Sequence, residues 1–223
     1  DASRIAILKR IADKIWEINT SAYVILEHFA DNSEEKILAD YGMMLWGNSN
    51  WNYAQSSMGY TNESDFSWGF YKSRSWNQPH LVTYMESHDE ERLMYKNLTW
   101  GNSSGSYNIK TLTTALERIK MTAAFFLTLP GPKMLWQFGE LGYDYSIEYK
   151  GRLEKKPIRW DYYQEPDRLR LYKTFQALIK LRSENDVFTS ASTTPIMALS
   201  GNVKSITMSG SSLNVVIIGN FGV

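Results

Sequence analysis

Acidic side chains stand directly after two apolar segments of this chain. Glu27 follows the apolar residues 22–26, and His88 and Asp89 follow the apolar and aromatic residues 81–85. A desolvated carboxyl group keeps its proton and a hydrogen-bonded one stays ionised, so two neighbouring carboxyl groups can act as acid and anion in one reaction. The pattern therefore predicts acid–base chemistry by Glu27 and Asp89.

The two apolar segments have the composition of buried β-strands, which can present charge only at their carboxyl ends. Parallel α/β sheets carry their functional sites at that edge. Buried strands are expected at residues 22–26, 43–46, 81–85 and 133–138, and amphipathic helices at residues 4–18, 33–40, 109–128 and 166–183. This alternation predicts parallel βαβ units. We expect residues 47–53 to form a polar, aromatic loop and a long polar loop to follow the third strand.

The hydrophobic period changes from 3.6 to 2 near residue 186. Strands are expected at residues 195–199, 203–208 and 213–218, joined by short turns that require antiparallel pairing. The chain thus divides into an α/β unit, residues 1–185, and an antiparallel β unit, residues 186–223. Four parallel strands cannot close a barrel that needs eight, so the first unit is interpreted as half of a barrel.

Composition excludes several classes of function. Lys plus Arg and Asp plus Glu number 24 each, so no net charge favours binding to nucleic acid or to an anionic membrane. The absence of cysteine excludes disulfides and thiolate metal sites, and it leaves the choice between the cytoplasm and an exported location open. Aromatic residues make up 14% of the chain, several in loops rich in Asn, Ser and Gly, an arrangement typical of sugar binding.

Carboxylates that meet at one edge of a parallel sheet favour glycoside hydrolysis, whose oxocarbenium-like transition state needs both an acid and an anion. Several motifs resemble the α-amylase superfamily, glycoside hydrolase family 13. Residues 85–89 (Met-Glu-Ser-His-Asp) are similar to its late signature, and residues 23–27 are similar to its acid-bearing strand. Residues 127–132 and 139–142 resemble its eighth strand and the following turn. The resemblance covers residues 1–185, and the β unit stands where the family has a small antiparallel domain.

The resemblance implies a partial (β/α)8 TIM barrel, strands five to eight with their helices, followed by an antiparallel β unit. It implies that Glu27 is the general acid/base of a retaining enzyme that cleaves α-1,4-glucosidic bonds in starch or glycogen. Asp89 would bind sugar hydroxyls and stabilise the transition state, and His88 would donate a hydrogen bond to the same glucosyl ring. The implied partner is an α-glucan.

His28, Arg92 and Trp51 are further candidates for substrate binding. For His28, a packing or hydrogen-bonding role is favoured over that of a metal ligand, because no second and third ligand stand near it at a familiar spacing. Arg92 can bind a sugar or can pair with Glu90, Glu91 or another acid. Trp51 follows the second strand and can stack on glucose.

The family's nucleophile lies in a Gly-x-Arg-x-Asp pattern on the strand before the first helix of the resemblance, and this sequence has no such pattern. Asp1 could be that nucleophile, but Ser3 and Arg4 after it favour a helix N-cap. We expect a C-terminal fragment that is inactive alone, because the acid and the nucleophile of a retaining glycosidase act as a pair. No cofactor is expected in these residues, although the resemblance allows calcium in a longer protein. The unpaired edges of a half-barrel predict association, for example as a homodimer.

Other interpretations remain open. A branching enzyme or another transglycosylase of the same family would share these motifs. A carbohydrate-binding relative without catalysis would keep the barrel alone. An unrelated open α/β sheet would hold Glu27 and Asp89 far apart.

Overall fold

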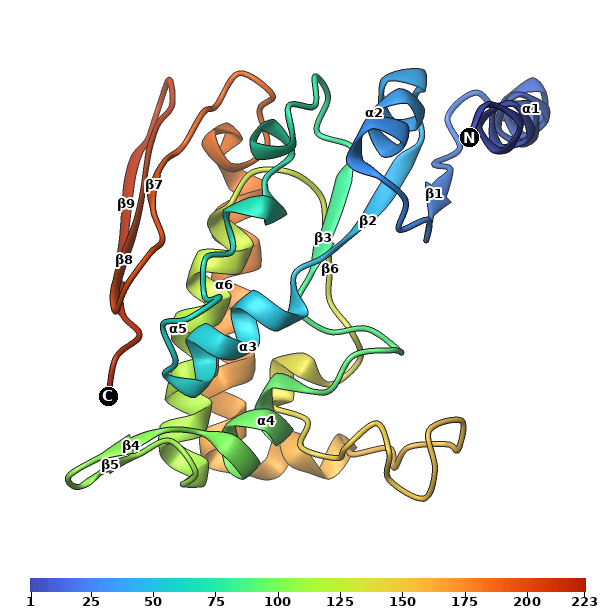
Figure 1. The fold of residues 1–223 in the computed structure, drawn as a ribbon. Helices are drawn as coiled ribbons and strands as arrows, with labels where there is room; N and C mark the ends of the chain where they lie inside the picture. The colour runs from blue at the N-terminus through green and yellow to red at the C-terminus, as the bar shows by residue number, and fades with distance from the viewer.

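A parallel sheet of four short strands is the centre of the computed structural model, which describes all residues 1–223. The strands are β1 (Ile25–Leu26), β2 (Met44–Asn48), β3 (Leu81–Tyr84) and β6 (Lys133–Met134), and they lie side by side in that order (Figure 1). The predicted parallel sheet is therefore confirmed. The outer strands β1 and β6 are shorter than expected because only two residues of each pair with the neighbouring strand. The first strand is also not buried as predicted, since Ile25 is exposed at the open edge of the sheet.

Helices connect the strands. They are α1 (Ala2–Ile18), α2 (Asn32–Tyr41), α3 (Asn50–Met58), α4 (Leu93–Trp100), α5 (Leu112–Thr128) and α6 (Pro166–Glu184), with short 3₁₀ turns at Ser67–Gly69, Tyr71–Arg74, Gly139–Leu141, Trp160–Gln164 and Asp186–Phe188. The Asp1 side chain accepts a hydrogen bond from the Ser3 amide at 2.8 Å, which confirms it as the N-cap of α1. None of the helices combines the length and the apolar character that crossing a membrane requires.

Two of these helices contradict the loops expected from the sequence. The expected loop at residues 47–53 ends in the first turn of α3, and α4 begins within the expected loop after the third strand. The residues that start α3 are weak helix formers. The side-chain Nδ2 of Asn50, however, donates to the carbonyl oxygens of Met85 (2.7 Å) and Glu91 (2.9 Å). In α4, Leu93 and Met94 are buried. Tertiary packing thus determines both helices.

An antiparallel sheet follows the parallel one, as predicted. Its strands are β7 (Ile196–Ala198), β8 (Val203–Ser209) and β9 (Asn214–Asn220), paired in that order. It packs against α5, where a Cβ atom on Gly219 would stand 2.8 Å from Cε2 of Phe125, so glycine permits the close approach. A separate hairpin, β4 (Ser103–Ser104) and β5 (Tyr107–Asn108), connects α4 to α5 and extends outward near the N-terminal end of α5 (Figure 1).

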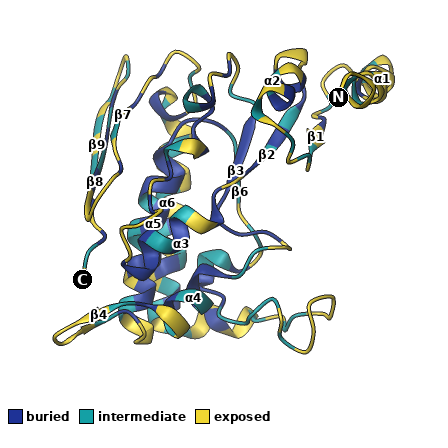
Figure 2. Cartoon of the chain, viewed as in Figure 1, coloured by how far each residue is buried: buried dark blue, intermediate teal, exposed yellow.

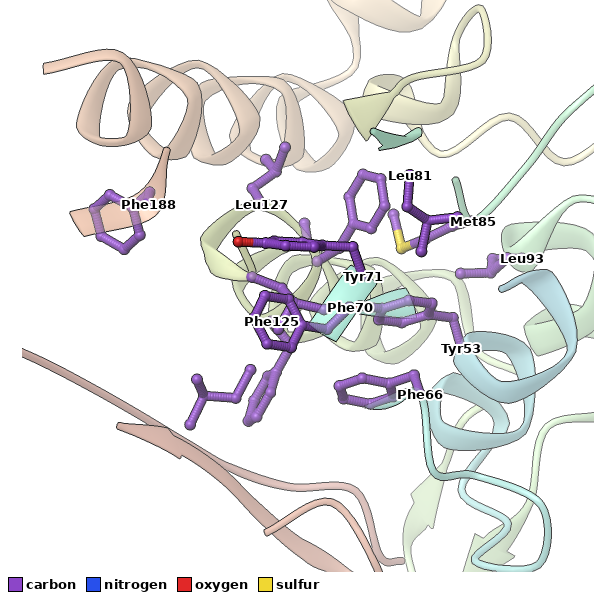
Figure 3. Packing of buried hydrophobic residues seen from close by; sticks show 14 of the residues in the cluster. Tyr53, Phe66, Phe70, Tyr71, Leu81, Met85, Leu93, Phe125, Leu127 and Phe188 are labelled. Atoms are coloured by element: carbon purple, nitrogen blue, oxygen red, sulfur yellow. The ribbon is translucent and has the colours of Figure 1, made fainter. Parts of the chain in front are cut away.

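One contiguous hydrophobic core joins the two sheets through α5. Tyr53 and Phe66 stack with ring centroids 4.4 Å apart, and Phe125 packs between them and the antiparallel sheet (Figure 3). Figure 2 shows the buried residues concentrated on α5, on β3 and on part of β2, whereas α1 is largely exposed. The core therefore fixes β2 and β3, and with them the loops at their carboxyl ends.

Candidate active site

Glu27, His88 and Asp89 come together at the carboxyl ends of two different strands. Glu27 follows β1 directly, and His88 and Asp89 lie in the loop after β3. The functional side-chain atoms of the three residues all lie within 4.8 Å of one another. His88 Nε2 stands 3.7 Å from Glu27 Oε1 and 3.9 Å from Asp89 Oδ2. The predicted convergence of the two carboxylates is confirmed, and their catalytic roles stay predictions.

Aromatic rings support the imidazole of His88. The ring of Trp46 on β2 lies 5.8 Å from it, edge on, and the ring of Trp136 after β6 lies 6.1 Å away. Trp46 also packs against Tyr84, at 5.3 Å. Glu27, His88 and Asp89 nevertheless keep 40–57% of their side-chain surface exposed, so a solute can reach all three.

The loop that carries His88 and Asp89 is closed by a buried ion pair. Glu86 accepts a hydrogen bond from Arg92 Nη1 at 3.0 Å and another from the Leu93 amide at 2.7 Å. Within the loop, Ser87 Oγ accepts a hydrogen bond from the Asp89 amide at 3.1 Å. The two ends of this loop are thus anchored by a buried pair, and Ser87 holds the backbone of the exposed Asp89 between them.

Arg92 is therefore placed differently from a substrate-binding residue. It is only 3% exposed, and its guanidinium lies 4.8 Å from the centre of the Tyr143 ring as well as on Glu86. This burial leaves no side-chain surface for a sugar, and the acid-pairing alternative describes the structure, with Glu86 as the acid.

The other two predicted binding residues have partners of their own. His28 Nε2 lies 2.8 Å from Oε1 of Glu34 on α2, which agrees with the hydrogen-bonding alternative for this residue. Trp51 lies at the start of α3, half-exposed, and its indole donates to Glu63 at 3.1 Å. The half-exposed Trp51 ring is available to a ligand, whereas the His28 imidazole is engaged.

Arg152 belongs to the site, although sequence reasoning did not identify it. Its Nη2 donates to Oδ1 of Asp89 at 3.1 Å and to the Asp89 carbonyl oxygen at 2.8 Å. Hydrogen bonds to Glu148 and to Asp89 raise the pKa of Arg152 above its ordinary value. No sequence signal could have selected it, because Lys150, Lys155 and Lys156 are basic residues of the same segment.

Tyr84 contributes a buried hydroxyl group beside the carboxylates. Burial, and then the negative charges of Glu90 and Glu27, raise the pKa of this phenol. The hydroxyl has no hydrogen-bond partner in the protein, and the residue is 0% exposed. The Tyr84 hydroxyl therefore keeps its proton and can donate a hydrogen bond from beneath the site.

The cluster of Glu27, His88 and Asp89 also has the donor types that bind a divalent cation. The same groups serve proton transfer and sugar binding as they stand, and this is the chemistry that the arrangement supports.

Comparison with known proteins identifies the architecture. No protein-family model and no curated protein matches the chain. Solved structures do match: an α-amylase from H. orenii (14% identity, TM-score 0.64), a cyclomaltodextrin glucanotransferase with a three-domain ABC distribution (15%, 0.72) and an α-amylase from Geobacillus thermoleovorans complexed with acarbose (14%, 0.66). These matches include 97–99% of this chain and 42–47% of the solved chains.

The chain therefore spans less than half the length of these solved structures. At such identities the match establishes the fold, that of a partial α-amylase-type barrel with its antiparallel β unit. The fold class predicted from the sequence is thereby confirmed.

Proposed function

We propose that this chain is the acid-bearing half of a retaining α-glucan-active glycoside hydrolase of the α-amylase type. The observation that carries the proposal is the meeting of Glu27, His88 and Asp89 within 4.8 Å at the strand ends of an amylase-like half-barrel. Glu27 protonates the departing glycosidic oxygen and then activates water. Asp89 and His88 bind hydroxyl groups of the glucosyl residue that develops positive charge.

Retention of configuration is proposed from the resemblance to the α-amylase fold, because the distance between Glu27 and Asp89 does not test it. In retaining glycosidases the acid and the nucleophile stand about 5–5.5 Å apart. A further carboxylate is required when Asp89 binds hydroxyl groups rather than attacking carbon. Glu90 does not supply it, because it accepts hydrogen bonds from Asn48 and Ser87.

Two kinds of measurement test this proposal on the 223-residue chain. Calorimetric titration with maltoheptaose should show binding that Asp89→Asn weakens at least fivefold and that cellohexaose does not reproduce. Glu17→Gln, which alters an exposed pair with Lys14 on α1, is the matched control and should bind like the parent chain. Absence of maltoheptaose binding, or equal binding of cellohexaose, would contradict an α-glucan site.

Chromatography of the same mixtures tests the expected inactivity. The chain should release no shorter sugars from maltoheptaose, because Glu27 acts as the acid and Asp89 binds hydroxyl groups, which leaves no carboxylate at the site as nucleophile. Release of sugars that is lost in Glu27→Gln would overturn the expectation that the chain is inactive alone.

Transfer to another sugar is the second candidate activity. It is favoured by the match to a cyclomaltodextrin glucanotransferase at a TM-score of 0.72. Both activities use the same acid and the same transition state, and they differ in whether water or a sugar hydroxyl reaches the intermediate. The products formed from an α-glucan by a protein that contains this chain distinguish the remaining roles. New branch points would indicate branching activity, and binding without any product would indicate a purely carbohydrate-binding role.

We also propose that the chain associates through its β1 end. The outer face of α1 exposes Ile7, Ile11, Ile15 and Ile18, and β1 pairs with β2 only. An unpaired strand edge beside an apolar helix face favours self-association. Light scattering should show dimers that Ile11→Lys dissociates, and a monodisperse monomer of the parent chain at high concentration would contradict this.

A further inference from the structure

The loop of residues 146–157, called the Arg152 loop below, has an internal framework of its own. Lys156 lies at its centre, and Nζ donates to the carbonyl oxygens of Tyr149 (3.2 Å), Gly151 (2.6 Å), Arg152 (3.3 Å) and Glu154 (3.0 Å). Gly151 adopts φ of 114°, where a side chain would strain the turn. The backbone that carries Arg152 is therefore wrapped around a single ammonium group.

Both ends of the Arg152 loop are tied to the molecule. At one end, Glu91 accepts hydrogen bonds from Ser146 Oγ at 2.7 Å and from the Ile147 amide at 3.0 Å. At the other end, the Tyr143 hydroxyl donates to the carbonyl oxygen of Pro157 at 2.5 Å. Glu91 is two residues from Asp89, so the first tie sets the loop directly against the segment that holds the catalytic candidate. In Figure 1 the loop after β3 projects to the right, above the Arg152 loop at the lower right.

The two oxygen atoms of the Asp89 carboxylate face different partners. Oδ1 accepts the hydrogen bond from Arg152, and Oδ2 is the atom 3.9 Å from His88 Nε2. Because a second bond runs from Arg152 to the Asp89 carbonyl oxygen, the guanidinium holds the side chain and the backbone of Asp89 at once. Rotation of the carboxylate would break the first bond and leave the second.

We infer that Arg152 is a positioning residue, which binds Oδ1 of Asp89 and thereby keeps Oδ2 turned toward Glu27 and His88, where a glucosyl hydroxyl binds. The inference rests on the proposed function for its substrate, but not for its geometry. Arg152 acts through Asp89 and needs no contact with the sugar.

The contact between Arg152 and Asp89 is exposed to solvent, and this determines which measurement can detect it. Arg152 and Asp89 keep 46% and 57% of their side-chain surface exposed, so salt screens their attraction and the pair adds little to stability. The pair therefore affects the orientation of the Asp89 carboxylate rather than the stability of the fold. Replacement of Arg152 should therefore change the surroundings of His88 and leave the unfolding midpoint unchanged.

The experiment compares Arg152→Gln with Arg152→Lys and with Arg170→Gln in the 223-residue chain. Arg170 is a matched control, because it is an exposed arginine that pairs with Asp167 on α6. The first readout is the set of imidazole NMR signals, which is simple because the chain has 3 histidines. The second is calorimetric titration with maltoheptaose.

Arg152→Gln should shift the ring signals of His88 and leave those of His28 and His80 in place. It should weaken maltoheptaose binding about fivefold, the upper end of what an exposed ion pair contributes. Arg152→Lys should restore part of both effects, and Arg170→Gln should show neither. For the parent chain, 0.5 M NaCl should move the His88 signals in the same direction as Arg152→Gln.

Unchanged His88 signals in Arg152→Gln would overturn the inference, as would a loss of affinity that Arg170→Gln reproduces. If the parent chain binds no maltoheptaose, the proposed function fails, and the His88 signals still decide whether Arg152 orients Asp89. The two failures are therefore distinguishable.

Discussion

Replacing Glu86 with glutamine removes the charge from the buried pair that closes the loop of His88 and Asp89. Glu86 and Arg92 keep 10% and 4% of their side-chain surface exposed, so water cannot compensate the guanidinium when its partner becomes neutral. The glutamine oxygen can still accept the hydrogen bond from the Leu93 amide, now at 2.7 Å from the carboxylate. The substitution therefore isolates the charge of Glu86.

The magnitude follows from this burial. Breaking a buried ion pair by removing one partner costs about 3–5 kcal/mol, and the retained amide bond places Glu86→Gln near the lower limit, at about 3 kcal/mol. For a chain of this size, that loss lowers the unfolding midpoint by roughly 6–12 °C. The exposed pair of Glu17 and Lys14 should cost below ~0.5 kcal/mol in Glu17→Gln.

Urea unfolding followed by tryptophan fluorescence measures these differences. A double-mutant cycle with Arg92→Met isolates the pair: the double variant should be at least ~2 kcal/mol more stable than the two single losses together predict, because it leaves no unpaired buried charge. Equal costs for Glu86→Gln and Glu17→Gln, or additive costs in the cycle, would refute the reasoning that this pair holds the loop.

Further predictions concern the surroundings of this pair and the contact between the two sheets. Burial, and then the nearby charge of Glu86, raise the pKa of Glu140, so ionisation of this carboxyl group disfavours the folded state. Glu140→Gln should therefore stabilise the chain at pH 7. Calorimetric scans should show this gain disappearing below about pH 4.5, where the carboxyl is protonated in both the folded and the unfolded state. A Cβ atom on Gly139 would stand 2.8 Å from Oε2 of Glu86, so Gly139→Ala should cost about 1–3 kcal/mol in urea unfolding, and little of that cost should remain in a Glu86→Ala background. The buried guanidinium of Arg118 donates to carbonyl oxygens of α3 and of the residues after β9, including that of Phe221 at 2.6 Å; Arg118→Met should therefore cost about 3 kcal/mol and accelerate proteolysis of residues 214–223, and unchanged digestion would contradict this anchoring role.

The positions of the two carboxylates were predictable because both follow apolar strands without an intervening element. Glu27 stands at the end of β1, and Asp89 five residues beyond the end of β3, so parallel pairing brings them to one edge. Arg92 has the same local signal, a charged residue after a strand, yet it is buried. The direction of its side chain depends on Glu86 and Tyr143, 6 and 51 positions away, which no local pattern specifies.

Hydrophobic periodicity in the sequence alone determined the parallel sheet, the long helices α1, α5 and α6, the antiparallel β unit and the edge at which Glu27 and Asp89 meet. These features depend on which residues avoid water, and that preference is written in each residue type. Only the tertiary structure decided that residues 50–58 and 93–100 are helical, that Glu86 rather than a neighbour neutralises Arg92, and that Arg152 reaches Asp89. Those outcomes depend on hydrogen bonds and charge pairs between segments distant in the chain, whose partners become defined only when the core has brought the segments together.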